Sequence, residues 1–489
     1  MSRRNGGIVG PVNRPVGGFV AGSASGVWRM NDVLTFVSNN QWPKGPENIE
    51  NSCIFNDNDS PNLSRTPSSA SSRTTWTWSA WIKRSNITGG QMVLFGAKAD
   101  SSNDTGIWFE SDETLKFFNN VGGTVKQIRT NALFRDISAW YHVVAVWDSS
   151  NSTAGDRMRL YINGVEVTSF GTDTNPGDGD ESTINSTVIH QIGRVDSTYH
   201  FDGYMAEVVF VDGQALDASS FCEFNTASGI WTPKKIGQFA NAGANSFYLN
   251  FKDSSNLGND ESGLNNDYTV GGITSLDQTT DTCVENFSTL NAILGNTGVN
   301  AFSEGNTVVE FTGGGNGSSL STFGLQAGRW YAECKIITTG NGAGVGIFGT
   351  QTDINAWVNI VDGIVYANSG QKNVNGSETS SVGATFTDND IIGVALDITS
   401  GDVEFFKNGS SQFTVNLSDM LTGGNSDSTY FFGFSDASGA TSGKGAFNFG
   451  NPSFSISSGN SDANGFGNFE YAVPSGFYAL NTSNLNTYG

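Results

Sequence analysis

The sequence predicts an all-β protein made of two antiparallel β-sandwich (jelly-roll) domains in tandem behind a short N-terminal arm. Its 489 residues include 62 Gly but only 10 Pro, and Gly, Asn, Ser and Thr separate short apolar runs, as in turn-rich β proteins. Two stretches have the same pattern, "RLYINGVEVTSF" at 159–170 and "EFFKNGSSQFTV" at 404–415. Each comes just after an apolar strand that ends in Asp, which indicates that one sheet architecture occurs twice.

A chain of this length can hold two or three domains with cores of their own. We expect four segments: an arm at 1–45, a first sandwich at 46–235, a connecting segment with extra strands at 236–299, and a second sandwich at 300–489. The sandwiches are not close sequence copies, so we infer shared architecture rather than a recent duplication.

The strands of the first sandwich follow from alternation. In "TWTWSAWIK", Trp76, Trp78 and Ile82 fall on one face, which we expect to be buried. "WYHVVAVWD" at 140–148 is apolar on both faces and predicts a central strand covered on both sides. His142 lies within this strand, where a hydrogen-bonded core histidine is a better interpretation than a metal ligand or catalytic base.

The second sandwich follows the same course. "RWYAECKII" at 329–337 alternates so that Cys334 should be a buried free thiol. "DIIGVALDITSGDVEFFKNG" at 390–409 contains a long apolar strand that ends at Asp397, followed by a hairpin strand. In both sandwiches the Asn-Gly pair predicts a type I′ turn, which needs two residues with positive φ.

The four cysteines show no metal-binding spacing. Cys53, Cys222, Cys283 and Cys334 contain no C-x-x-C pair, so we expect no zinc site. Cys53 and Cys222 lie near opposite ends of the first sandwich and could form a disulfide if the terminal strands are adjacent, although nothing else indicates an oxidising compartment.

The charge and the lengths of the apolar runs argue against several functions. A formal net charge of −22 argues against nucleic-acid binding, because a phosphate backbone attracts a basic surface. No run of about 18 apolar residues occurs, so we expect no membrane insertion. The N-terminal stretch resembles a signal peptide in its two arginines, but Gly and Pro interrupt every apolar run before a usable core forms.

The arm differs from the rest of the chain. Residues 1–45 carry a net charge of +4, which leaves the remainder near −26. Gly and Pro prevent a regular element at the start, whereas apolar residues at helical spacing before Pro43 predict a short helix. The arm is therefore either a docking segment for an acidic partner or a solvated tail. The candidate docking residues are Arg3, Arg4, Arg14, Trp28, Phe36 and Trp42.

One acidic loop is a candidate calcium site. The stretch "TDTNPGDGDES" brings four carboxylates within nine residues, Asp173, Asp178, Asp180 and Glu181. Hard oxygen ligands on a Gly-containing loop suit Ca²⁺. The spacing does not match an EF-hand, so a solvated acidic loop is the alternative, and calcium is the one candidate cofactor.

A second acidic stretch is a candidate catalytic site. Retaining glycosidases need two carboxylates about 5 to 5.5 Å apart. "FESDET" supplies Glu110, Asp112 and Glu113, but the apolar pattern stops there and then resumes, which predicts a hairpin tip exposed to water. None of the three His residues lies in a nucleophile motif either, so we expect no enzymatic activity.

Ordered motifs carry a family resemblance in each half. Residues 49–233 resemble a concanavalin A-like jelly roll of the laminin-G type, and residues 300–489 resemble a SPRY (B30.2-like) domain. The first match rests on "WTWSAWIKRS", "MVLFGAKA", "GIWFESDETLKFFNN", "WYHVVAVWD", "RLYINGVEV", "HQIGR" and "FDGYMAEVVFVDGQAL". The second rests on "AGRWYAECKI", "GVGIFG", "DIIGVALDITSGDVEFFKNG", "FGFSD" and "FNFG". The laminin-G resemblance also implies that calcium can occupy the rim of the sandwich.

Further segments resemble those that flank such domains in marine bacteriophage virion proteins. They are "GGIVGPVN", "ASGVW", "DESGLNNDYTV" and "DTCVENFSTLN", the last with Cys283 where the related pattern has proline. The resemblance implies a virion protein assembled in the host bacterial cytoplasm, namely a tail fibre, a spike or a surface adhesin that binds a host-surface glycan or protein. It also implies contact with other virion proteins through the arm, and a homo-oligomer. The alternatives are a purely structural capsid or tail component and, more remotely, a glycan hydrolase.

Overall fold

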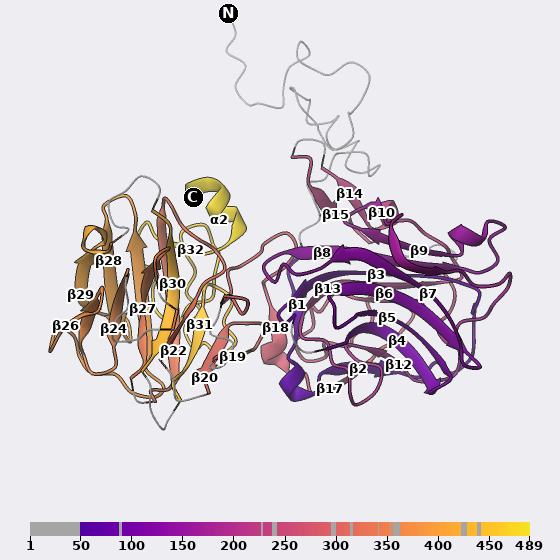
Figure 1. Ribbon diagram of the computed structural model, residues 1–489, viewed down its shortest axis with the longest axis horizontal. Helices are drawn as coiled ribbons and strands as arrows, with labels where there is room; N and C mark the ends of the chain where they lie inside the picture. Colours follow the sequence, from indigo (N-terminus) through magenta and orange to yellow (C-terminus); the bar gives the residue numbers. More distant parts are fainter. Residues whose placement is uncertain are drawn as a thin grey trace, which may run out of the picture.

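The computed structural model describes most of the chain from residue 49 onward. The described residues are 49–87, 90–225, 228–236, 242–294, 300–312, 316–340, 342–352, 354–355, 362–421, 428–437 and 442–489. The predicted arm at 1–45 lies outside these residues, together with its short helix and all six candidate docking residues. Two sandwiches lie side by side along the long axis (Figure 1).

Two eight-stranded sheets form the first sandwich. Sheet A runs in the order β10 (Val165–Glu166), β9 (Met158–Ile162), β8 (Trp140–Asp148), β3 (Thr75–Arg84), β13 (Gly203–Asp212), β1 (Ser52–Phe55) and β18 (Gln278–Thr279), with β16 (Phe247–Leu249) also paired to β13. Sheet B runs in the order β11 (Phe170–Thr174), β7 (Thr124–Leu133), β6 (Thr114–Val121), β5 (Asn103–Phe109), β4 (Met92–Asp100), β12 (His190–Ile192), β2 (Asn62–Arg65) and β17 (Thr269–Gly271). A separate hairpin, β14 (Cys222–Phe224) and β15 (Trp231–Pro233), stands outside both sheets.

The second sandwich also has two sheets. Sheet C runs in the order β19 (Asn300–Ser303), β20 (Val308–Phe311), β31 (Lys444–Asn448), β22 (Arg329–Thr338), β27 (Ile391–Asp397), β28 (Asp402–Lys407) and β29 (Ser410–Asn416), with β32 (Tyr478–Ala479) parallel to β22. Sheet D runs in the order β21 (Gly317–Leu320), β30 (Tyr430–Asp436), β23 (Gly344–Gly349), β24 (Gly363–Ala367), β25 (Lys372–Val374) and β26 (Ser377–Thr379). The prediction of an all-β fold with two antiparallel sandwiches is confirmed.

Helical elements are few and short in the described part of the chain. The single-turn 3₁₀ helices are η1 (Asp57–Asp59), η2 (Ala154–Asp156), η3 (Ala218–Ser220), η4 (Ser275–Asp277) and η5 (Leu417–Asp419), and the α-helix is α2 (Thr482–Tyr488). No helix among the described residues has the length and apolar character that crossing a bilayer requires.

The segment predicted as a connection, 236–299, supplies strands to the first sandwich. β16 pairs with β13, β17 pairs with β2, and β18 pairs with β1. The extra strands expected there therefore complete sheets A and B, and the first sandwich continues to Thr279.

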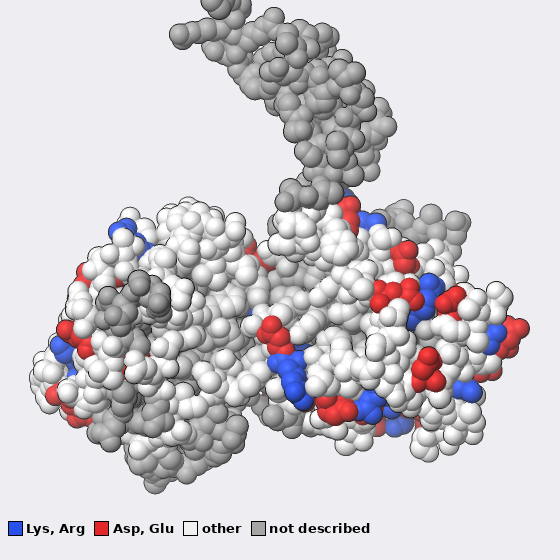
Figure 2. Space-filling model, turned by 45° about the horizontal axis from the view of Figure 1, so that its top comes forward, with Lys and Arg blue, Asp and Glu red and all other residues white. Residues whose placement is uncertain are grey.

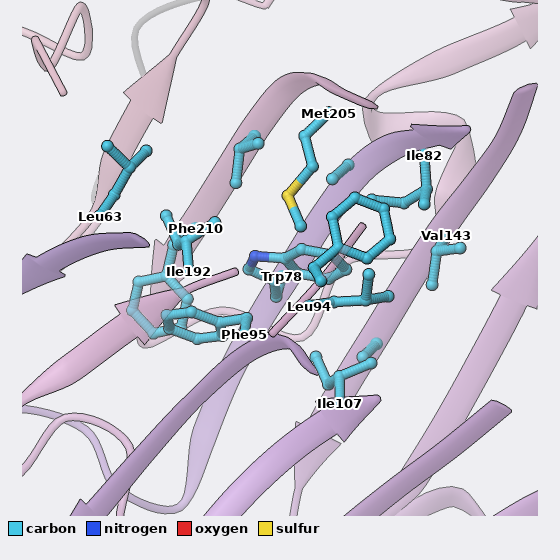
Figure 3. Close-up of a cluster of buried hydrophobic side chains, with 14 of the residues drawn as sticks. Leu63, Trp78, Ile82, Leu94, Phe95, Ile107, Val143, Ile192, Met205 and Phe210 are labelled. Atoms are coloured by element: carbon cyan, nitrogen blue, oxygen red, sulfur yellow. The ribbon is translucent and has the colours of Figure 1, made fainter. Parts of the chain in front are cut away.

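Each sandwich has its own core. In the first, Trp78 stacks on Phe95 with ring centroids 6.1 Å apart and an interplanar angle of 3° (Figure 3). Strand β8 contributes Val143 to this core and Val144 to a second apolar cluster on the outer face of sheet A. β8 is therefore central and covered on both sides, as predicted. The core of the second sandwich contains Trp330 and the other inward residues of β22.

Both Asn-Gly turns have the predicted geometry. Asn163 and Gly164 have φ of 48° and 83°, and Asn408 and Gly409 have φ of 47° and 75°. Each Asn also accepts a hydrogen bond, at 2.8 Å, from a main-chain N–H of the strand before the hairpin. A ring lies against each Gly, because an added Cβ would come within 2.7 Å of Trp231 or 2.6 Å of Tyr471. The same hairpin therefore occurs twice for the same local reasons.

The Cys53–Cys222 disulfide that the sequence left open does not form, because both thiols are free and lie in different clusters. Cys53 points between sheets A and B, whereas Cys222 belongs to the cluster outside sheet A. Cys334 is a buried free thiol, as predicted, and burial raises its pKa.

Candidate functional site

A tight turn of the second sandwich docks against the first. The turn between β19 and β20 contains Gly305, whose carbonyl accepts a 2.6 Å hydrogen bond from the Tyr204 hydroxyl. Asn306 Nδ2 donates to the main-chain oxygen of Ser85 at 2.7 Å. An added Cβ on Gly305 would lie 2.1 Å from Tyr204 Oη, so only glycine fits here. The turn fixes the position of one sandwich against the other.

A buried lysine binds the segment that connects the two sandwiches. Lys83 Nζ lies 2.8 Å from Asp281 Oδ2 and also donates to Asn286 Oδ1 at 2.7 Å and to the Phe287 carbonyl at 3.2 Å. Trp140 Nε1 donates to the other Asp281 oxygen at 3.1 Å. The Lys83 and Asp281 side chains are almost completely buried. This network holds residues 281–287 against the ends of β3 and β8.

Helix α2 of the second sandwich is attached to the same connecting segment. The Thr482 N–H donates to the Asn286 carbonyl at 2.9 Å, and the Asn286 N–H donates to Thr482 Oγ1 at 3.1 Å. Ser483 hydrogen-bonds to the carboxylate of Glu285. The helix is thereby placed beside the first sandwich (Figure 1).

An open groove of about 750 Å³ lies where these parts meet. Sheet A, the β14–β15 hairpin, the connecting segment and α2 all contribute to it. Its lining residues are Trp81, Ala139, Trp140, Asn163, Phe224, Ile230, Trp231, Thr232, Cys283, Val284, Asn286, Thr482, Ser483 and Asn486. We call it the junction groove.

The β14–β15 hairpin supplies an aromatic wall. Phe224 and Trp231 pack edge to face with centroids 4.7 Å apart. Phe224 is 52% exposed and Ile230 is 62% exposed, and exposed apolar side chains that gather in one patch are typical of binding sites. These residues give the groove an exposed apolar surface.

His142 holds this wall in place. Trp231 Nε1 donates to His142 Nδ1 at 3.1 Å, which leaves Nε2 to donate to the hydroxyl of Ser79 at 2.9 Å. Burial lowers the pKa of His142 to about 3. The prediction of a hydrogen-bonded core histidine is confirmed, and its role is to orient the Trp231 ring.

The acidic stretch at 110–113 is a hairpin tip, as predicted, but one of its acids is not exposed. Glu113 is buried and lies 2.6 Å from Arg84. Glu110 pairs with Lys116 at 3.0 Å. Hydrogen bonds from Thr114 and Arg129 lower the pKa of Asp112 to about 2. Each carboxylate thus has its own cation.

The structure does not bring the four candidate calcium ligands together. Asp180 accepts a 2.6 Å hydrogen bond from the Gly177 N–H, Glu181 pairs with Arg73, and Asp173 accepts from Asn175. Among the described residues, no group of three or more His, Cys, Asp or Glu side chains is arranged to hold a metal ion. Asp173, Asp180 and Glu181 therefore each have a separate hydrogen-bond or ion-pair partner.

We accordingly expect calcium to leave the stability unchanged. A ligand that binds only the folded state raises the melting temperature, and the rise grows with the ligand concentration relative to its dissociation constant. Melting curves in millimolar Ca²⁺ and in chelator should coincide, and Asp180→Asn should behave alike in both. A rise in melting temperature with Ca²⁺ that Asp180→Asn removes would contradict this expectation.

Sequence reasoning missed the junction groove. Its lining comes from positions as far apart as Trp81 and Asn486, so no local pattern brings them together. The one signal in the sequence was the hairpin stretch "FCEFNTASGIW" at 221–231, which places large apolar residues in a turn-rich segment.

Comparison with known families supports both resemblances. Residues 57–220 match the laminin-G model of the concanavalin A-like lectin/glucanases superfamily, and residues 329–423 match the SPRY domain model. No curated protein matches the chain.

Several solved structures are similar to parts of the chain. The SPRY domain of human HERC1 is 20% identical and covers 29% of this chain and 87% of its own, with a TM-score of 0.25. A second human SPRY domain is 15% identical, with 29% and 91% covered and a TM-score of 0.23. The native heptameric SAP-like pentraxin from Limulus polyphemus is 19% identical, with 47% and 97% covered and a TM-score of 0.29. From its family matches, the chain carries a concanavalin A-like domain of the laminin-G type followed by a SPRY domain.

Proposed function

We propose that this chain is a bacteriophage virion protein, namely a tail fibre, spike or other surface adhesin that binds a glycan or protein on the host surface. The junction groove is the observation that carries the proposal, because it is open, aromatic and formed jointly by two sandwich domains. The virion setting is supported by the segments that resemble those flanking such domains in phage proteins, "DESGLNNDYTV" and "DTCVENFSTLN" among them.

The proposal describes a binding protein rather than an enzyme. Glycoside hydrolysis uses two carboxylates that face one bond, one of them protonated. The acids at 110–113 are each paired with a separate cation, and Asp112 has a lowered pKa. This supports recognition without cleavage.

The proposal also fits partners other than nucleic acid. On the face shown in Figure 2, acidic and basic side chains are scattered over both lobes, and no single basic patch gathers there. With a net charge of −22, an acidic surface of this kind would repel a phosphate backbone. We propose that the protein acts on the virion, as a homo-oligomer, alongside other virion proteins.

The test uses labelled virions and host cells. Antibodies against the purified protein should label intact particles, and the fluorescent full-length protein should bind cells of the phage host and compete with phage adsorption. Labelled particles without any binding of the protein to cells would favour the alternative, a purely structural capsid or tail component. Absence of label would refute the virion assignment.

Deletion of residues 1–45 should leave a folded protein that no longer enters virions. The described residues from 49 onward contain both cores, so the truncated chain has the apolar burial it needs. We expect a soluble β-rich protein with a cooperative melt and loss of incorporation into particles. Normal occupancy of the truncated protein would place the anchor elsewhere, and failure to fold would make the arm part of a core.

A further inference from the structure

The junction groove has an uncharged lining. All fourteen lining residues are apolar or neutral polar, in a chain that contains 25 basic and 47 acidic residues. An acidic ligand would find no cation in the lining and would meet a net charge of −22. A cationic ligand would find no carboxylate there. The lining therefore favours a neutral ligand.

The two walls differ in chemistry. The first sandwich offers the rings of Phe224 and Trp231, together with the aliphatic side chain of Ile230. Helix α2, on the other side, offers the hydroxyl of Thr482 and the amide of Asn486. A ligand that fits must have an apolar face and a rim of hydrogen-bonding groups, and a sugar ring has both.

Two side-chain amides of the groove, those of Asn163 and Asn486, are available to a ligand. Asn486 is exposed, and its side-chain amide makes no hydrogen bond with the described residues. Asn163 uses its Oδ1 to accept from the His142 N–H, so Nδ2 is left for a ligand. Such amides can donate to and accept from sugar hydroxyls.

The aromatic wall is held in position before any ligand arrives. Trp231 is fixed by its hydrogen bond to His142 and by contact with Gly164, where an added Cβ would lie 2.7 Å from the ring. The opposite wall is fixed through the bonds between α2 and Asn286. Preorganisation of this kind reduces the entropy lost on binding.

Resting on the adhesin function above, we propose that the junction groove binds a neutral oligosaccharide of the host surface, with a sugar face on Phe224 and Trp231 and hydroxyls on the Asn163 and Asn486 amides. Its volume of about 750 Å³ lies within the range of about 300–1,000 Å³ for small-ligand sites. Because both sandwiches contribute, neither domain alone contains the site.

The test measures binding of the full-length protein to host cells and to sugars. Periodate, which cleaves the vicinal diols of sugars, should abolish cell binding, whereas protease treatment of the cells should not. Neutral tetrasaccharides of hexose or N-acetylhexosamine should compete for cell binding at least about tenfold better than sulfated or uronic-acid tetrasaccharides.

Variants locate the site. Trp231→Ala and Phe224→Ala should each weaken binding about tenfold or more, and Asn486→Ala should weaken it severalfold. Tyr199→Ala is the matched control, because this aromatic is 36% exposed and lies away from the groove against Trp108. Phe224 and Asn486 are exposed, so their variants keep the test valid even if Trp231→Ala unfolds.

The outcomes separate the two proposals. If all groove variants bind cells like the wild type, or if protease and not periodate abolishes binding, the saccharide inference is overturned while the adhesin function stands. The inference also fails if no neutral tetrasaccharide competes at millimolar concentration. If the wild-type protein does not bind untreated cells, the adhesin function fails and the inference falls with it.

Discussion

Replacing Lys83 by Met is expected to lower the free energy of unfolding by about 3–5 kcal/mol, because it leaves the carboxylate of Asp281 buried without its cation. The pair has an N–O distance of 2.8 Å, and both side chains are almost completely buried. Lys83 also makes the hydrogen bonds that hold Asn286 and Phe287. Urea titrations followed by tryptophan fluorescence measure the loss.

Two matched variants make this test specific. Lys252 pairs with Glu50 at 3.5 Å with both side chains exposed, so Lys252→Met should cost less than about 1 kcal/mol. The double variant Lys83→Met with Asp281→Asn should recover part of the loss, since no buried charge remains. Equal costs for Lys83→Met and Lys252→Met would show that the buried pair does not stabilise the junction.

The pH dependence of the Lys83→Met effect has a definite sign. Burial raises the pKa of Asp281 even with Lys83 in place. Without the lysine, that pKa rises further, so the folded variant takes up a proton more readily as the pH falls. The cost of Lys83→Met should therefore be largest at neutral and alkaline pH and smaller in mild acid.

Local patterns predicted the strands and turns because each depends on near neighbours in the sequence. Alternation in "TWTWSAWIK" identified the buried face that holds Trp76 and Trp78, and each Asn-Gly pair identified its turn. The family resemblances added the order of the strands. These features need no knowledge of distant parts of the chain.

Alternation also shows which side a residue faces, but not what covers that side. Glu333 lies on the face of β22 opposite Cys334, as predicted, yet it is fully buried. Its carboxylate accepts main-chain N–H groups of Glu470 and Tyr471, which come from more than 130 residues away. Only the folded chain reveals that the C-terminal segment covers this face.

The acidic stretches illustrate the same limit. The calcium prediction counted carboxylates within nine residues, but Arg73, the partner of Glu181, lies 108 residues earlier in the sequence. Glu113 was expected at an exposed hairpin tip. The local pattern could not show that Arg84, which belongs to another strand, forms a buried ion pair with it. Whether an acid is free to bind a metal or act in catalysis therefore depends on basic residues that lie far away in the sequence.

The junction also contains an acid whose protonation should change stability. Glu304, in the turn that docks onto the first sandwich, accepts a 2.9 Å hydrogen bond from Asn56 Nδ2. Burial, together with the negative charges of Asp277 and Asp59, raises the pKa of Glu304 to about 7, and Lys444 opposes this only in part. The folded state therefore binds a proton at pH values where the unfolded chain, with an ordinary glutamate, has lost it.

The sign of the effect follows from this difference. The stability gained from proton binding by Glu304 is fully present below about pH 4.5 and is lost as the pH rises through about 7. At pH 8 the ionised side chain faces two acids across the domain junction and is destabilising. Because Glu304 is partly exposed, solvent screening limits the effect to about 1–2 kcal/mol.

Glu304→Gln should therefore stabilise the protein at pH 8 by about 1–2 kcal/mol and have little effect at pH 4.5. Glutamine keeps the oxygen that accepts from Asn56 and removes the charge. Thermal and urea unfolding of the wild type and of Glu304→Gln from pH 4.5 to 8 measures the difference between their free energies of unfolding. The titration of neighbouring acids is common to both proteins and largely cancels in this difference. Glu50→Gln is the control, because Glu50 pairs with Lys252 at 3.5 Å with both side chains exposed. A difference between Glu304→Gln and wild type that does not change with pH, or that grows toward acid, would show that folding does not raise the pKa of Glu304.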